Sequence, residues 1–339
     1  MRAAVFSEPG PASSVLQIVE RDLPLAGAGE VRVRIVLSAV NPTDTGTRAG
    51  RGVPDGVAPP RVPNQDGAGV VDALGEGVQD LEPGDRVWVW DAAWTRADGT
   101  AQEYVVLPRH QVVRMNDGIP FEIGAALGIP ALTAHRCLTL AADGPARLAP
   151  GALEGREVLV AGGAGAVGNA AIQLAKWAGA TVWTTVSSKE KAELAAAAGA
   201  DAVINYREED VAARIRELSE SGPDLIVEVS TANLDLDLDV VAPGGDIALY
   251  MGGDVTVPSF KAMVKNVSLD FVLTYTTTAE EKQYAVEAVA EAVDDGAFRV
   301  GAEAGLPLHR FALDEIAAAH EAVENHAVGK VLIEISSGR

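Results

Sequence analysis

The chain has 339 residues, 48% of them hydrophobic, and a formal net charge of −21. This length predicts about two domains with ample apolar residues for their cores. The negative charge argues against nucleic acid and anionic membranes as partners, because phosphate groups bind to basic patches. No run reaches the ~18 apolar residues of a membrane helix, and Cys137 is the only cysteine, which excludes a disulfide framework. The first residues hold too short an apolar stretch for a signal peptide, so we expect a cytoplasmic protein.

Acidic residues outnumber basic ones by 48 to 27, and most of the basic ones are arginine. Two explanations fit this composition. Adaptation to high salt would tolerate crowded surface acids, because salt screens their mutual repulsion. A GC-rich genome would instead favour arginine and alanine over lysine without any such adaptation. The sequence leaves both explanations open.

Residues 1–125 predict a mainly β domain. Residues 31–35 alternate apolar and polar side chains, which is typical of a half-buried strand, and residues 70–71 and 87–90 belong to further strands. Prolines and glycines such as Pro42 separate these segments and indicate turns. Short strands separated by turns are typical of a small barrel.

A glycine-rich turn follows in the middle of the chain. Residues 158–161 predict a buried strand, residues 169–177 a helix and residues 181–186 a second buried strand. The turn between the first strand and the helix contains the G-x-G-x-x-G pattern of dinucleotide-binding proteins. Glycines there allow a tight turn, close approach of a pyrophosphate to the backbone, and close packing of helix on strand.

The first turn of the predicted helix would then meet the phosphates with free N–H groups. The whole strand–turn–helix–strand unit therefore predicts a cofactor site. The predicted dinucleotide-binding loop comprises Gly162, Gly163, Ala164, Gly165, Ala166, Val167 and Gly168.

The second strand of this unit ends without an acidic residue. A carboxylate at that point would bind the ribose 2′-hydroxyl of NAD and repel the 2′-phosphate of NADP. None occurs between Gly168 and Lys189, so the sequence favours NADPH over NADH. Ser187 and Glu190 have the spacing of a capping box, which also predicts the start of the next helix at this point.

Strands and helices alternate through the rest of the chain. We expect helices at residues 125–140 (interrupted at Pro130), 189–198, 209–220, 279–294 and 313–325, and strands at residues 202–205, 225–229, 247–250, 267–273 and 330–335. Continuous apolar strands alternating with helices predict a parallel sheet covered on both faces. The residues after about 275 are too few for a core of their own, so we expect them to return to the first domain.

Several segments in matching order carry a family resemblance: Val40-Asn41-Pro42-Thr43-Asp44, Arg48-Ala49-Gly50, residues 63–70, Pro83-Gly84-Asp85-Arg86-Val87, residues 128–134, the glycine-rich loop and Gly329-Lys330-Val331. Over essentially its whole length the chain resembles the medium-chain dehydrogenase/reductase superfamily, and within it the zinc-free quinone oxidoreductases that include zeta-crystallin. The resemblance implies an α/β fold of two domains. A doubly wound, parallel-sheet (Rossmann) NADPH-binding domain would span residues 129–275, and a mainly β, GroES-like barrel domain would span residues 1–128 and 276–339.

The resemblance also implies that no metal is bound. The zinc-dependent branch of the superfamily places a cysteine and a Gly-His-Glu triplet in the first domain, whereas residues 39–41 and 64–66 fill the matching stretches without Cys or His. The four-cysteine structural lobe is missing too. A catalytic zinc needs three protein ligands. No ligand spacing is found among the five histidines, His110, His135, His309, His320 and His326.

By the same resemblance, Asn41 and Thr133 match residues that approach the nicotinamide, although Thr133 could instead bond a carbonyl of its own helix. Ser187 and Lys191 match positions that hold the 2′-phosphate, and Tyr206 closes over it. The implied cofactor-binding residues beyond the glycine-rich loop are Ser187, Lys191, Tyr206, Tyr250, Leu273 and Lys330, where Tyr250 could also be a core residue.

The implied substrate-pocket residues are Asp44, Gly46, Trp90 and Trp94. Many family members carry a tyrosine at the position of Gly46, and its absence would widen the pocket unless Trp90 or Trp94 fills the space. No general acid stands out in the sequence, which leaves water as the proton source.

The resemblance implies an NADPH-dependent, zinc-independent oxidoreductase that reduces quinones or related conjugated carbonyl compounds by hydride transfer. Conjugation in such an acceptor delocalises the arriving charge, which no metal is present to stabilise. Two alternatives stay open: a reductase of enones, 2-enals or enoyl thioesters on the same scaffold, and a non-catalytic NADPH-binding protein such as zeta-crystallin in the lens.

A homodimer is also implied. Residues 267–273 would close the nucleotide-binding sheet and could pair with the same strand of a second copy. The alternative is an ordinary edge strand that the charge of Asp270 protects.

Overall fold

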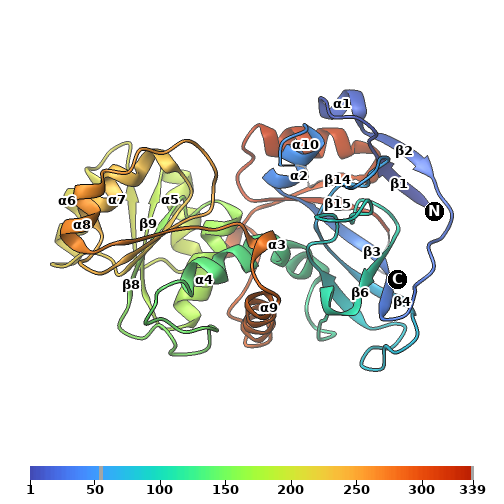
Figure 1. The fold of residues 1–339 in the computed structure, drawn as a ribbon, viewed down its shortest axis with the longest axis horizontal. Coiled ribbons are helices and arrows are strands. Elements are labelled where there is room, and N and C mark those ends of the chain that lie inside the picture. The colour runs from blue at the N-terminus through green and yellow to red at the C-terminus, as the bar shows by residue number, and fades with distance from the viewer. Residues whose placement is uncertain (53–55, 337–339) are drawn as a thin grey trace. The chain divides into compact units, whose positions relative to one another are not determined.

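A computed structural model describes residues 1–52 and 56–336, and the chain forms two compact units, each with its own sheet (Figure 1). One unit comprises Met1–Ile129 together with Leu308–Arg339, and the other comprises Pro130–Pro307. The predicted α/β class, with one parallel sheet and one mainly antiparallel sheet, is confirmed.

A seven-stranded sheet forms the core of the first unit, with strands in the order β14-β15-β3-β4-β5-β7 and β6 paired to β3. The strands are β3 (Glu30–Val40), β4 (Asp66–Leu74), β5 (Arg86–Val89), β6 (Tyr104–Pro108), β7 (Val112–Arg114), β14 (Leu308–Ala312) and β15 (Lys330–Glu334), beside a hairpin of β1 (Arg2–Val5) and β2 (Gln17–Glu20). β3 pairs with β6 along its first half and with β15 along its last residues. Register shifts in its pairing with β4 allow this long strand to bend between the two partners.

Three short helices belong to the first unit: α1 (Ala12–Val15), α2 (Pro42–Arg48) and α10 (Ile316–Glu324). Sequence reasoning assigned Pro42 to a turn, whereas it opens α2. Asn41 precedes the helix in an extended conformation, and proline suits the first helical position because its missing N–H would have no partner there.

Six parallel strands form the core of the second unit, in the order β10-β9-β8-β11-β12-β13. They are β8 (Glu157–Ala161), β9 (Thr181–Val186), β10 (Ala202–Asn205), β11 (Leu225–Glu228), β12 (Asp246–Leu249) and β13 (Ser268–Phe271). This order reverses direction between β8 and β11. In doubly wound sheets, ligands bind beyond the carboxyl ends of the strands at that reversal.

The helices of this unit are α4 (Ala166–Trp177), α5 (Lys189–Ala197), α6 (Val211–Leu218), α7 (Leu234–Val240), α8 (Ser259–Lys265) and α9 (Ala279–Asp294). Sequence reasoning missed α7 and α8. In α7, leucine and aspartate alternate with the period of a strand, and the helix is set by burial of Leu234 and Leu238 on one face. None of the helices within the described ranges is long and apolar enough to cross a membrane.

The stretch 276–307 lies in the second unit, whereas the sequence-based boundaries placed it in the first. Two amide side chains on α4 form hydrogen bonds with the last part of the stretch 276–307. The Nδ2 of Asn169 donates to the carbonyl of Ala304 (2.8 Å), and Gln173 bonds both the carbonyl and the N–H of Arg299. These bonds join segments far apart in the chain, so no local pattern indicates them.

Helix α3 (Phe121–Leu138) breaks at Gly128 rather than at Pro130. Gly128 has φ 5° and ψ −119°, and a Cβ there would lie 2.0 Å from Oδ1 of Asp66. Glycine therefore lets the backbone pass directly over a buried carboxylate, which also accepts the N–H of Ile129 (2.9 Å).

Candidate functional site

The glycine-rich loop follows β8, at the point where the strand order reverses. Gly162 has φ 73°, a conformation that favours glycine. A Cβ on Gly163 would lie 2.2 Å from Oγ1 of Thr184, and one on Gly168 would lie 2.4 Å from the carbonyl oxygen of Gly162. The pattern thus brings strand, turn and helix α4 into backbone contact.

Gly165 differs from Gly163 and Gly168 because a Cβ there would meet nothing closer than 3.4 Å. Gly165 is the N-cap of α4. No side chain there forms a capping hydrogen bond with the first N–H groups of the helix. Orphan N–H groups at a helix N-terminus attract anions. The predicted loop, Gly162 to Gly168, therefore has the geometry of a phosphate site.

Polar residues stand beside the end of β9. Lys191 Nζ donates to Ser187 Oγ (3.0 Å), and Tyr206, which is exposed, follows β10 next to β9. Arg207 lies over the Tyr206 ring, 5.7 Å from its centroid. The structure thus brings together the predicted residues Ser187, Lys191 and Tyr206.

The capping box predicted for Ser187 and Glu190 is wrong by one residue. Ser188 is the N-cap of α5, and its hydroxyl accepts the N–H of Lys191 (3.3 Å). Because two serines are adjacent, the spacing rule chose the first. The hydroxyl of Ser187 is therefore not needed as a helix cap.

Three further predicted residues belong to the second unit. Thr133 Oγ1 lies 2.7 Å from Oγ1 of Thr274, not on a carbonyl of its own helix. Tyr250 follows β12, and burial raises the pKa of its phenol. Leu273 is 46% exposed.

Sequence reasoning missed a buried carboxyl pair at the carboxyl end of β11. Glu228 accepts the N–H of Ser230 (2.6 Å) and the amide of Asn233 (3.0 Å), and Asp237 of α7 is hydrogen-bonded to it. Burial and the charge of Glu228 raise the pKa of Asp237 to about 9, so the pair holds a proton at neutral pH. An acid that ends an apolar strand is the one sequence signal for this pair.

In the first unit, Asn41 joins a buried ionic cluster. Its Oδ1 accepts from Lys330 Nζ (2.5 Å), and its Nδ2 donates to Oδ2 of Asp66 (2.6 Å). Lys330 Nζ lies 3.8 Å from the same Asp66 oxygen. Burial lowers the pKa of Lys330, and the two carboxyls beside it oppose this shift. The predicted cofactor residue Lys330 is thus committed to protein partners.

Asp44 lies next to this cluster on the first turn of α2. Its Oδ2 accepts the backbone N–H of Asn41 (2.7 Å), whereas Oδ1 is buried with no partner among the described residues. Burial, and then the charge of Asp66, raise the pKa of Asp44 to about 8. The first unit therefore brings Asn41, Asp44 and Lys330 together.

The other predicted pocket residues are spread around the same unit. A Cβ on Gly46 would meet only the carbonyl oxygen of Arg51, at 3.9 Å, so there is space at this position. Trp90 is buried and packs edge-on against His110, with ring centroids 6.2 Å apart. Trp94 is partly buried. Trp90 is therefore a core residue.

Amides occupy the stretch where the zinc-dependent branch carries metal ligands. Asn64 Nδ2 donates to Ser38 Oγ (2.9 Å), and its Oδ1 lies 3.1 Å from Nε2 of His320. Gln65 Oε1 accepts the N–H of Ala93 (2.8 Å). Across residues 1–52 and 56–336, no group of three or more His, Cys, Asp or Glu side chains could hold a metal ion.

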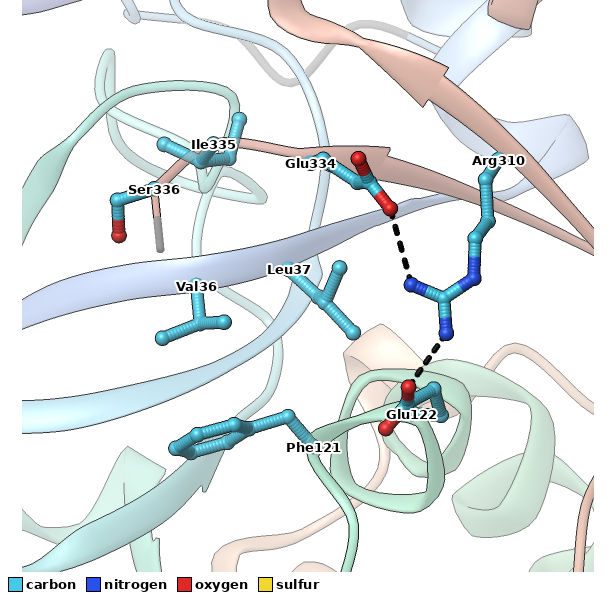
Figure 2. A pocket seen from close by; sticks show the side chains of 8 residues that line it. All are labelled: Val36, Leu37, Phe121, Glu122, Arg310, Glu334, Ile335 and Ser336. Carbon is cyan, nitrogen blue, oxygen red and sulfur yellow. Dashed lines mark hydrogen bonds and ion pairs between the residues drawn. The ribbon is translucent and has the colours of Figure 1, made fainter. Parts of the chain in front are cut away.

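A pocket of about 550 Å³ lies elsewhere in the first unit, beside Val36 and Leu37 of β3 and the end of β15 (Figure 2). Arg310 forms ion pairs with Glu122 and Glu334 across one wall, and apolar side chains, including Leu37 and Phe121, form another. None of the predicted site residues lines it.

Comparison with known proteins agrees with this geometry. Residues 27–117 match the family model described as alcohol dehydrogenase GroES-like domain, and residues 166–291 match that of zinc-binding dehydrogenase. A quinone oxidoreductase of Lama guanicoe is 30% identical, over 98% of this chain and 97% of that protein.

Two solved structures are similar over nearly the whole chain. A quinone oxidoreductase of Pseudomonas syringae pv. Tomato DC3000 superimposes with a TM-score of 0.82 at 28% identity, covering 98% of this chain and 99% of the other. The Escherichia coli quinone oxidoreductase, complexed with NADPH, gives a TM-score of 0.80 at 26% identity, covering 98% and 100%.

Two glycines of the pattern, Gly165 and Gly168, separate packing from ligand binding. We expect Gly168→Ala to lower the free energy of unfolding by about 1–3 kcal/mol, because its Cβ would overlap the Gly162 backbone. Gly165→Ala should lower stability less, by the smaller cost of alanine at an N-cap, and should weaken dinucleotide binding, because its Cβ would stand at the N-terminus of α4. Urea unfolding and fluorescence titration measure the two effects. Equal stability losses in both variants would contradict this assignment.

Proposed function

Because the chain belongs to the quinone oxidoreductases of the medium-chain dehydrogenase/reductase superfamily, we propose that it is an NADPH-dependent, zinc-independent reductase of quinones or related conjugated carbonyl compounds. The fold is that of an oxidoreductase with a nicotinamide-dinucleotide domain. When bound, the nicotinamide supplies a hydride. The residues described above bind and orient the cofactor.

The cofactor preference rests on the end of β9. No carboxylate follows this strand to repel a 2′-phosphate, and an ammonium and a hydroxyl, from Lys191 and Ser187, stand there already in contact. Because Ser188 caps α5, both groups can bind phosphate without loss of the cap. This is the observation that carries the choice of NADPH.

The choice of acceptor class rests on the polar groups of the first unit and on the space at Gly46. The charges of the unit's buried cluster, around Lys330, balance one another. The amides of Asn64 and Gln65 occupy the stretch that carries metal ligands in the zinc-dependent branch, where a metal would polarise an alcohol. Such a site suits an acceptor that delocalises charge by itself, as quinones and enones do. A Cβ on Gly46 would clash with no atom, so the missing tyrosine side chain leaves at least that much room for an acceptor.

The Lys191 contact gives a direct test of cofactor choice. A hydrogen bond to a charged group contributes ~1.5–3 kcal/mol, so Lys191→Ala should weaken NADPH binding by about tenfold or more. NADH affinity should hardly change, because NADH lacks the phosphate. Titration by calorimetry measures both affinities.

The matched controls lie in the same turn. Lys189→Ala removes an exposed lysine of the same helix and should leave both affinities unchanged. Ser188→Ala should lower stability by ~1 kcal/mol through the lost cap and leave the NADPH preference intact. Equal losses for NADPH and NADH in Lys191→Ala would refute the phosphate site.

A panel of acceptors tests the reaction. We expect NADPH oxidation with quinones, enones or 2-enals, no oxidation of simple alcohols, and undiminished rates in a strong chelator. NADPH consumption and elemental analysis of the purified protein measure these outcomes. Activity confined to enones and 2-enals would favour the second acceptor class. Tight binding without turnover of any acceptor would favour a non-catalytic role, and stoichiometric zinc would contradict the metal-free proposal.

We also propose a homodimer formed through β13. This strand is the edge of the parallel sheet, and exposed apolar side chains gather on it and on α8: Phe260, Met263, Val264 and Phe271. Such a surface is typical of a protein interface. Asp270, the charge that could protect the edge, is itself partly buried.

Sedimentation at micromolar concentration should show a dimer for the wild type. Replacing both Phe260 and Met263 with glutamate should give a monomer, because two like charges would be buried at the two-fold contact. The control is Leu25→Glu, which changes a leucine that is 85% exposed in the first unit and should leave the dimer intact. A monomeric wild type would contradict the proposal.

A further inference from the structure

The buried cluster of the first unit holds two carboxyl groups and one ammonium. Asp44, Asp66 and Lys330 are 3%, 0% and 2% exposed. An unpaired charge costs several kcal/mol to bury, so such clusters tend towards neutrality. One carboxylate balances Lys330, and the other carboxyl therefore carries a proton at neutral pH.

The hydrogen bonds decide which carboxyl is protonated. Asp66 accepts from the N–H of Ile129 and from the amide of Asn41, and it is the closer partner of Lys330. Asp44 accepts from a single residue, Asn41, whose backbone N–H donates to Oδ2, and its Oδ1 has no partner among the described residues. Because donors stabilise the ionised form, the charge belongs on Asp66 and the proton on Asp44.

The pKa of Asp44 agrees with a proton on this carboxyl group. Burial and the charge of Asp66 on β4 raise its pKa to about 8, while Lys330 on β15 opposes the shift. Asp44 is thus an acid that is neutral at physiological pH and ionises slightly above it. An effective general acid has a pKa close to the working pH.

Asp44 also lines a small cavity of the first unit. The cavity has a volume of about 10 Å³, which is room for about one water molecule. Its polar wall is formed by Asp44, Thr47, Arg61, Asn64, Gln65 and Arg96. A water there would lie against the Asp44 side chain and can exchange a proton with its carboxyl group.

We propose that Asp44 is the acid that supplies the proton accompanying hydride transfer, through a water in this cavity. The inference rests on the proposed function. A C–H bond forms as the acceptor takes a hydride from NADPH, which is oxidised to NADP⁺. The oxyanion of the reduced acceptor then takes a proton relayed from Oδ1 of Asp44, an O–H bond forms, and Asp44 becomes a carboxylate that solvent water reprotonates.

Infrared spectroscopy tests whether the Asp44 carboxyl group is protonated, and it requires no turnover. The difference between wild type and Asp44→Asn at neutral pH should contain the carbonyl stretch of a protonated carboxyl group, and this band should vanish in the wild type as the pH rises through about 8. Asp117→Asn, at an exposed position, should show no such band. A difference spectrum with only carboxylate bands at neutral pH would overturn the inference.

Kinetics test the transfer. The wild-type kcat should fall above about pH 8, because the acid form is required. Asp44→Asn keeps the size and the buried contacts, and should lower kcat by about 10²- to 10⁴-fold and remove this limb of the profile. Across a series of quinones, the loss should shrink as the hydroquinone becomes more acidic, because its anion then needs less help from an acid. If Asp44 had only a structural role, its replacement would not remove the high-pH limb of kcat, and the loss of kcat would not depend on the acidity of the hydroquinone.

The outcomes separate the inference from the function. If the wild type reduces conjugated carbonyls while Asp44→Asn keeps the same kcat and pH limb, the role of Asp44 is refuted and the function stands. If the wild type reduces none of them, the function and the donor role both fail. If Asp44→Asn does not fold, the pH series is recorded on Asp237→Asn, which removes the other protonated carboxyl: loss of its remaining carbonyl band in step with kcat supports the inference, and a pH limb without a band change refutes it.

Discussion

The buried contact of Lys330 with Asn41 and Asp66 organises the first unit. It joins the start of β15, the residue that caps α2 and the start of β4, while the same Asp66 receives the N–H of Ile129 at the break of α3. Removing one partner of such a cluster would leave an uncompensated charge in the core. The close passage of Gly128 over Asp66 follows from the same requirement, since a carboxylate with no water around it must take backbone N–H donors.

The second unit depends on a different constraint, which is close backbone packing. Gly163 and Gly168 bring the turn against Thr184 and Gly162, so α4 begins directly beyond β8, at the reversal of the strand order. The two units thus offer complementary chemistry. One presents orphan N–H groups and the contact between Lys191 and Ser187, and the other holds a buried polar cluster whose net charge is balanced.

Local patterns in the sequence predicted much of this. Gly163, Gly165 and Gly168 are close in the chain, and their spacing is sufficient to identify the turn. The bounds of α9 were also predicted, and the structure adds a capping box of Thr278 and Glu281 at its start. Errors arose where two local rules competed, as at Ser187 and Ser188, or where polar and apolar residues alternated in a helix, as in α7.

The long-range contacts could not be predicted in this way. Nothing near Lys330 in the sequence indicates that it meets Asn41, 289 residues away. The same holds for Asn169 and Ala304, whose bond sets the extent of the second unit. The proton on Asp44 depends on counting donors around two buried carboxyls, which requires coordinates.

The place of β15 in the sheet has a consequence for synthesis on the ribosome. Val331 to Glu334 pair with the last residues of β3, so the first unit is completed only by residues that are translated after the whole second unit. The second unit, by contrast, is contiguous in the chain. The nascent protein can therefore finish its parallel-sheet unit while β3 still lacks one neighbour and two acidic side chains lack their cation. Until β15 is translated, β3 presents an open strand edge, which favours mispairing between chains.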